Sequence, residues 1–84
     1  MYVITLKRSA QKELANIPKP YNENIVLAID KLAENPRPEN VKKIKGEENA
    51  YRIRVGDYRV IYIVEDVIKI IEIQRIRHRK DAYK

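Results

Sequence analysis

Residues 50–64 read AYRIRVGDYRVIYIV, and the rest of the chain is interpreted outward from this stretch. Apolar and basic residues alternate over 51–55, and the alternation resumes over 58–64. A period of two is typical of β-strands that have one buried face. Gly56-Asp57, between the two runs, is a turn signal, so the stretch predicts a β-hairpin.

Three arginines of the predicted hairpin share one face. A two-residue turn places Arg54 opposite Arg59, and strand alternation puts Arg52 on the same side. Like charges opposite each other are destabilising, so we interpret the cluster as an anion site. The alternative is a solvated face partly neutralised by Glu72, which a second two-residue turn at Glu65-Asp66 would place opposite Arg59. The other face, expected to be buried, carries Ile53, Val55, Tyr58, Val60 and Tyr62.

The remaining pattern predicts one α+β domain over residues 1–84. We expect an antiparallel β-sheet of about four strands that includes an N-terminal strand, with a two-helix hairpin packed on one face. Ile61, Ile63, Ile68 and Ile70 would share the open face as an apolar patch, which a partner is expected to cover. The expected elements are a strand over Tyr2–Leu6, a helix capped by Ser9 and ending near Ile17, an amphipathic helix over 21–33, a short strand over Val41–Lys45 and a strand over Val67–Ile76.

Composition restricts the function. The net charge of +6 is uneven, because residues 42–84 hold 12 Lys/Arg against 7 Asp/Glu whereas residues 1–41 are nearly balanced. A basic half-domain suits a polyanion such as nucleic acid, and an acidic protein almost as well. With no cysteine and one histidine, we predict no metal site and no cofactor. No signal peptide or membrane span is apparent, so a cytoplasmic protein without membrane association is expected.

Arginine, one histidine and tyrosine remain as chemical groups, and they suit metal-free cleavage of RNA. The 2′-OH of RNA can attack the adjacent phosphate, and arginine presents a planar fork to phosphate oxygens. His78 could act as base or acid, and Tyr83 as proton donor or stacking platform, although a lone histidine or a terminal tyrosine is often only packed. The expected RNA-binding residues are Arg75, Arg79, Lys80, Lys43 and Lys45.

Three segments resemble the RelE/ParE toxin superfamily, and most closely its RelE branch. They are YRIRV at 51–55, YRVIY at 58–62 and RHRKDAY at 77–83. The resemblance implies a toxin of a type II toxin–antitoxin pair that enters the ribosomal A site and cleaves the mRNA codon, leaving a 2′,3′-cyclic phosphate. It also implies a RelB-like antitoxin, the ribosome and mRNA as partners, contact with operator DNA only through the antitoxin complex, and a monomeric free toxin.

The resemblance also implies roles for individual residues. Arg52 and Arg54 would bind the mRNA backbone and assist catalysis, Arg59 would stabilise the phosphate, and Arg77 would act on the transition state or leaving group. Tyr83 would stack on or activate the substrate. Either Arg77 or its neighbour Arg79 could be the essential arginine of the C-terminal segment.

The sequence departs from the family at the general base. Arg52 and Arg54 stand where some relatives have lysines, and arginine does not surrender a proton near neutrality. The base is therefore expected among His78, Tyr83 and Glu47/Glu48. Two other functions stay open at this point: a ParE-like inhibitor of DNA gyrase on the same fold, and a non-catalytic basic binding module.

Overall fold

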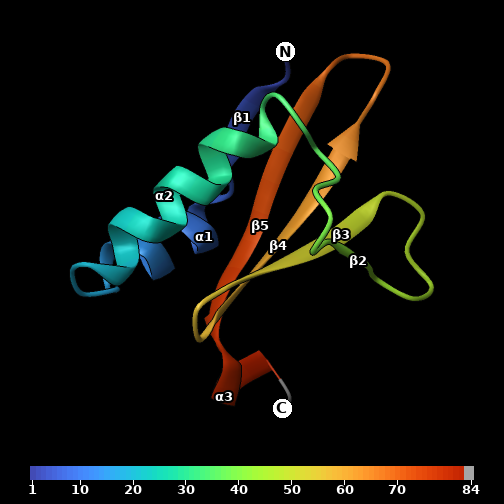
Figure 1. The fold of residues 1–84 in the computed structure, drawn as a ribbon. Helices are drawn as coiled ribbons and strands as arrows, with labels where there is room; N and C mark the ends of the chain where they lie inside the picture. Colours follow the sequence, from blue (N-terminus) through green and yellow to red (C-terminus); the bar gives the residue numbers. More distant parts are fainter. Residues whose placement is uncertain (83–84) are drawn as a thin grey trace.

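The computed structural model describes the backbone of residues 1–82 and the side chains of residues 1–80 (Figure 1). The strand order is β1-β5-β4-β3-β2, in which β1 runs parallel to β5 and every other pairing is antiparallel. The elements are β1 (Val3–Leu6), α1 (Arg8–Ala15), α2 (Tyr21–Leu32), β2 (Lys42–Lys43), β3 (Ala50–Val55), β4 (Tyr58–Glu65), β5 (Ile70–His78) and α3 (Arg79–Ala82). The predicted α+β class is confirmed, while the described part of the sheet has five strands and is mixed rather than antiparallel.

Both long helices cover the same face of the sheet, as predicted (Figure 1). Ile25, Ile29 and Leu32 recur at helical spacing in α2 and are buried. From the sheet they meet the alternate residues Ile53, Val60, Tyr62, Val64, Ile71, Ile73 and Ile76. Full burial of each such aliphatic side chain contributes about 1.5–3 kcal/mol, so this layer supplies most of the stability of so small a domain.

The start of α1 differs from the prediction. Lys7, with an extended backbone, occupies the N-cap position, and no side chain caps the helix. The expectation that Ser9 caps it was wrong. Ser9 lies two residues past the N-cap position, and its hydroxyl donates instead to the carbonyl oxygen of Gln74, at 3.1 Å, so it ties α1 to β5.

The turn between β4 and β5 is longer than predicted. Glu65 pairs with Ile70, so the turn comprises residues 66–69, and Lys69 adopts a positive φ of 57° within it. Ile68 therefore lies in this turn and is 63% exposed, rather than on the open face of a strand.

A β-bulge then shifts the register further along this strand pair. Tyr62 pairs with Ile73 but Ile61 pairs with Arg75, which leaves Gln74 as the extra residue of β5. Glu72 lies on the turn side of this bulge, and the four-residue turn places it opposite Ile63, not opposite Arg59. The alternative in which Glu72 neutralises the arginine face was based on the wrong pairing.

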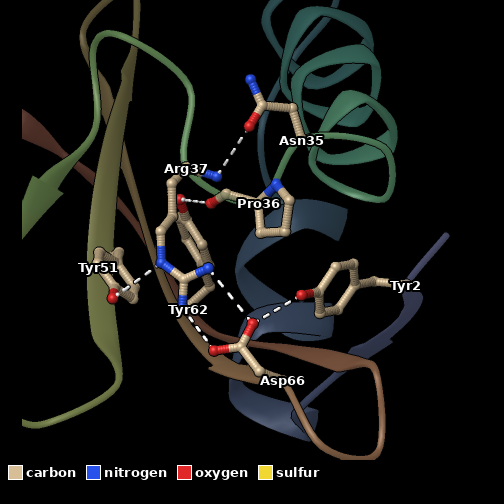
Figure 2. Close-up of polar contacts among 7 residues, drawn as sticks. All are labelled: Tyr2, Asn35, Pro36, Arg37, Tyr51, Tyr62 and Asp66. Carbon is tan, nitrogen blue, oxygen red and sulfur yellow. Dashed lines mark hydrogen bonds and ion pairs between the residues drawn. The ribbon is translucent and has the colours of Figure 1, made fainter.

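A polar cluster joins the linker after α2 to the rest of the sheet (Figure 2). The Arg37 guanidinium donates to both carboxylate oxygens of Asp66, at 2.8 and 3.3 Å, and through Nε to the Tyr51 hydroxyl, at 3.0 Å. The Tyr2 hydroxyl donates to Asp66 Oδ1 at 2.6 Å. Beside the cluster, the buried Tyr62 hydroxyl donates to the Pro36 carbonyl oxygen at 2.7 Å. These hydrogen bonds hold the linker between α2 and β2 in place against the sheet.

The cluster also makes stability depend on pH. The hydrogen bonds from Arg37 and Tyr2 lower the pKa of Asp66 below its ordinary value. A carboxyl whose pKa is lowered by folding stabilises the protein above its unfolded pKa of about 3.9, and this stabilisation is lost as the pH falls below that value.

Replacement of Asp66 should therefore remove an acid-sensitive part of the stability. We expect the free energy of unfolding of Asp66→Asn to be below that of the unmodified protein at pH 7, and the difference to shrink as the pH falls below about 4. Urea unfolding from pH 7 to pH 2, followed by circular dichroism, measures this difference. Glu65→Gln, one residue earlier, is the matched control, and an equal pH dependence of both variants would contradict the prediction.

Candidate nucleic-acid interface

The arginines predicted on one face lie there in the structure. Arg54 pairs with Arg59 across β3 and β4, as predicted from the two-residue turn, and Arg59 pairs in turn with Arg77 of β5. Arg52 is two residues before Arg54 and therefore shares its side of β3. Four arginines thus lie on the sheet face that the helices leave open. Directly opposed like charges are unfavourable, and a bound anion would relieve this repulsion.

A hollow of about 570 Å³ opens on this arginine face. Its volume falls within the range of about 300–1,000 Å³ that is usual for ligand sites. The hollow extends from the linker before β2 across β3 to β4, and its lining comprises Glu39, Asn40, Val41, Lys42, Arg52, Arg54, Gly56 and Arg59. It thus brings three of the predicted arginines together with residues 39–42, none of which was predicted to be a site residue.

Local contacts hold one wall of the hollow in place. Arg54 Nε donates to the Gly56 carbonyl oxygen at 3.0 Å, which turns the guanidinium toward the β3–β4 turn. Gly56 has a φ of 60°, a conformation that L-residues with a side chain rarely adopt. Asn40 Nδ2 donates to the Arg54 carbonyl oxygen at 3.4 Å, which joins the linker to β3.

The lysines of this region do not all share the arginine face. Lys42 pairs with Arg52 and lies with the arginines, whereas Lys43 pairs with Tyr51 and therefore faces the side of the helices. Lys45 is exposed in the loop between β2 and β3, at the end of β3 away from Gly56. Sequence reasoning missed Lys42, because the register of a two-residue strand cannot be deduced from its pattern.

Arg75 is held by a helix. Its guanidinium donates to the carboxylate of Glu13 on α1, with Nη2 2.9 Å from Oε2, and this hydrogen bond raises the pKa of Arg75. The other oxygen, Glu13 Oε1, accepts the backbone N–H of Ile76 at 2.8 Å. Arg75, predicted to bind RNA, thus already has an anionic partner within the chain.

His78 lies on the opposite side of the sheet from the arginines. It pairs with Tyr58, whose ring it meets edge-on at a centroid distance of 5.2 Å. Its Nδ1 accepts the backbone N–H of Lys80 at 3.3 Å. Arg79 and Lys80 are exposed in α3, where Arg79 N–H donates to the Asp57 carbonyl oxygen at 2.7 Å and so places the helix beside the β3–β4 turn.

The general-base candidates Glu47 and Glu48 do not line the hollow. Glu47 and Glu48 are exposed in the loop between β2 and β3. This loop precedes Ala50, and the length of β3 from Ala50 to Arg54, roughly 13 Å, separates the two carboxylates from the pair Arg54 and Arg59. Tyr83 lies outside the described residues. The structure instead places the carboxylate-bearing residue Glu39 in the lining, a residue that has no distinguishing signal in the sequence.

Within residues 1–82, none of the helices is long and apolar enough to cross a membrane. The described His, Asp and Glu side chains form no group of three or more that could hold a metal ion.

A five-stranded sheet with two helices on one face and an arginine-lined hollow on the other is suited to binding a polyanion. Comparison with known proteins places this chain more specifically. The model of the family described as "ParE toxin of type II toxin-antitoxin system, parDE" matches residues 4–83. The chain therefore belongs to this toxin family, within the RelE/ParE superfamily that its sequence resembles.

Individual relatives agree with this assignment. The chain is 32% identical to the putative toxin RelE1 of Methanocaldococcus jannaschii, over 96% of this chain and 93% of that protein. It is 38% identical to the toxin RelE3 of the same organism, over 86% and 84%. Among solved structures, the archaeal RelE–RelB complex from Pyrococcus horikoshii superposes with a TM-score of 0.83 at 32% identity, covering 93% of this chain and 94% of that one.

The contacts of Glu13 predict that its replacement lowers the stability of the protein more than replacement of Arg75 does. Glu13→Ala removes both the ion pair and the acceptor of the Ile76 N–H, so we expect the free energy of unfolding to fall by about 1–3 kcal/mol. Arg75→Ala removes only a partly exposed ion pair and should cost less than about 1 kcal/mol. Urea unfolding measures both, with Lys12→Ala on the same helix as control. A larger loss for Arg75→Ala than for Glu13→Ala would contradict this account.

Proposed function

We propose that this toxin is an endoribonuclease that cleaves mRNA in the ribosomal A site and thereby inhibits translation. The observation that carries the proposal is the hollow in which Arg52, Arg54 and Arg59 converge. Simple binding of one phosphate of the RNA backbone would not require three guanidinium groups. They suit a phosphorane, whose additional negative charge develops only in the transition state.

The proposed reaction begins with attack of the mRNA 2′-OH on the adjacent phosphorus. Arg54 and Arg59, paired across two strands, would bind the nonbridging oxygens. Arg77, the next residue in the same row, would stabilise the leaving oxygen. Tyr83 keeps its proposed role in stacking on or activating the substrate. Arg54, Arg59 and Arg77 all lie on one face of the sheet, as this scheme requires.

The partner that restrains the toxin is proposed to be a RelB-like antitoxin. The P. horikoshii structure to which this chain is similar is a complex of RelE with RelB. On α2, Val26 and Leu27 are 40% and 59% exposed and offer apolar surface to such a partner. The net charge of +6 favours an acidic antitoxin. The free toxin would be a cytoplasmic monomer that reaches operator DNA only through the antitoxin complex.

Mapping of 5′ ends in a purified translation system tests the function. One arm contains the toxin, ribosomes and mRNA, and the other contains the toxin and naked mRNA. We expect cuts within A-site codons in the first arm alone. Cuts in both arms would mean a ribonuclease that does not depend on the ribosome. Cuts in neither would contradict the nuclease, and a gyrase supercoiling assay would then test the ParE-like alternative.

The proposed role of Arg59 predicts the effect of replacing this residue. Arg59→Ala should lower the rate of A-site cleavage about 100-fold or more, since it removes a positioned donor to the developing charge. Single-turnover cleavage measures the rate, and circular dichroism verifies the fold. Arg8→Ala, at the exposed start of α1, is the control and should cleave normally. Cleavage at the unmodified rate by a folded Arg59→Ala would contradict the proposed role.

A further inference from the structure

A second hollow, here called the edge hollow, lies where α1 ends beside β5. Strand β1 ends at Leu6, which pairs with Ile73, so the later residues of β5 have α1 rather than a strand beside them. The edge hollow has a volume of about 290 Å³. Its lining comprises Glu13, Asn16, Ile17, Tyr58, Ile76, Arg77 and His78.

The edge hollow brings together side chains from both faces of the sheet, because both faces are accessible at an edge. Arg77 comes from the arginine face, where it pairs with Arg59. His78, the next residue, comes from the face of the helices and pairs with Tyr58. RNA bound along the arginine row therefore has a cation for its backbone directly beside the edge hollow.

Two aromatic rings line the edge hollow next to Arg77. The rings of Tyr58 and His78 meet edge-on, with centroids 5.2 Å apart and planes at 87°. An edge-on contact, unlike a stacked one, leaves ring faces uncovered by the other ring of the pair. His78 is only half-buried, and unpaired bases of RNA stack on the rings of tyrosine and histidine. The pair therefore suits the stacking of a base.

The His78 ring is held for stacking rather than for proton transfer. Its Nδ1 accepts the backbone N–H of Lys80 at 3.3 Å, so the neutral imidazole carries its proton on Nε2. The ring cannot accept a further proton without giving up this hydrogen bond. A base can stack on the ring while the bond stays intact, and a ring that is already held loses less freedom on binding.

The remaining lining offers polar groups to the edge of a base. Asn16, the exposed C-cap residue of α1, carries an amide that both donates and accepts hydrogen bonds. Glu13 is bound to Arg75 and to the Ile76 N–H, so an internal cation balances its charge. The volume lies close to the lower limit of about 300 Å³ for ligand sites, which suits one base rather than a larger ligand.

We propose that the edge hollow binds one unpaired nucleotide of RNA, whose base stacks on His78 and whose backbone contacts Arg77. The inference rests on the proposed nuclease function, which places RNA along the arginine row. The nucleotide belongs either to the mRNA or to ribosomal RNA at the A site, since both present the same chemistry. The edge hollow then holds RNA in register with the arginines, and His78 binds a base instead of transferring a proton.

Binding to ribosomes that carry a non-cleavable mRNA tests the site. The A-site codon of this mRNA has 2′-O-methyl groups, which remove the attacking hydroxyls and keep the bases. His78→Ala should bind about 5- to 150-fold more weakly, because one base loses its stacking partner. His78→Phe keeps an aromatic ring and should bind like the unmodified protein. Tyr21→Ala is the control, since this ring contacts Tyr58 but lies outside the lining.

Single-turnover cleavage of unmodified mRNA separates stacking from proton transfer. At saturating concentrations of toxin, His78→Phe should cleave at the unmodified rate and with an unchanged pH profile. Phenylalanine cannot replace a histidine that moves a proton. Slow cleavage by fully bound His78→Phe would therefore overturn the inference. Binding of His78→Phe as weak as that of His78→Ala would overturn it as well, because the aromatic ring would then not be what matters.

Abasic nucleotides in the mRNA identify the source of the base. If the mRNA supplies it, an abasic nucleotide at one position should weaken binding of the unmodified toxin and have no effect on His78→Ala. If the deficit of His78→Ala persists with an abasic nucleotide at each position of the codon and its neighbours, ribosomal RNA supplies the base. Either result supports a nucleotide site when His78→Phe binds normally.

The two proposals fail in different measurements. If the unmodified toxin cuts mRNA in the A site and His78→Ala binds the non-cleavable complex equally well, the edge hollow binds no base and the nuclease function stands. If the unmodified toxin cuts no mRNA but its binding depends on the ring of residue 78, the nuclease function fails and the nucleotide site stands.

Discussion

The pairing register of β3, β4 and β5 is the constraint on which the rest of the structure depends. It places Arg54, Arg59 and Arg77 in one row across three strands. Because side chains alternate along a strand, the same register places Ile53, Val60 and Ile76 in a row on the other face, where all three are buried. A slip of one residue would exchange the two rows. The core and the arginine face are therefore two consequences of a single set of hydrogen bonds.

The balance of energies explains how the protein tolerates so many like charges in line. A directly opposed pair of like charges costs roughly 0.2–1 kcal/mol in a sheet, whereas burial of one aliphatic side chain gains about 1.5–3 kcal/mol. The apolar row on the helix side thus outweighs the repulsion of the basic row. A phosphate chain on this face would reduce that repulsion further.

The sequence predicted those parts of the fold that local chemistry determines. Gly56-Asp57 fixed the first hairpin, and helical spacing identified α2, because both signals lie within a few residues. The turn over residues 66–69 contains no glycine, so nothing local marked its length. The contact of Arg37 with Asp66 joins residues 29 positions apart and has no local signal. The place of Glu39 in the lining of the hollow was missed for the same reason, since it arises only from the strands beside the linker.

The bulge in β5 decides which C-terminal side chains join the arginine face. Without the extra residue Gln74, the pairing of Tyr62 with Ile73 would continue so that Arg59 met Ile76, and Arg77 would point toward the helices. The buried residues Ile71, Ile73 and Ile76 record this shift, because their spacing changes from two to three. Helix α1 holds the bulge in place, with Ser9 bound to the Gln74 carbonyl and Glu13 bound to the next two residues of β5. The contacts of this helix, on the far side of the sheet, thus fix Arg77, the third arginine in the row.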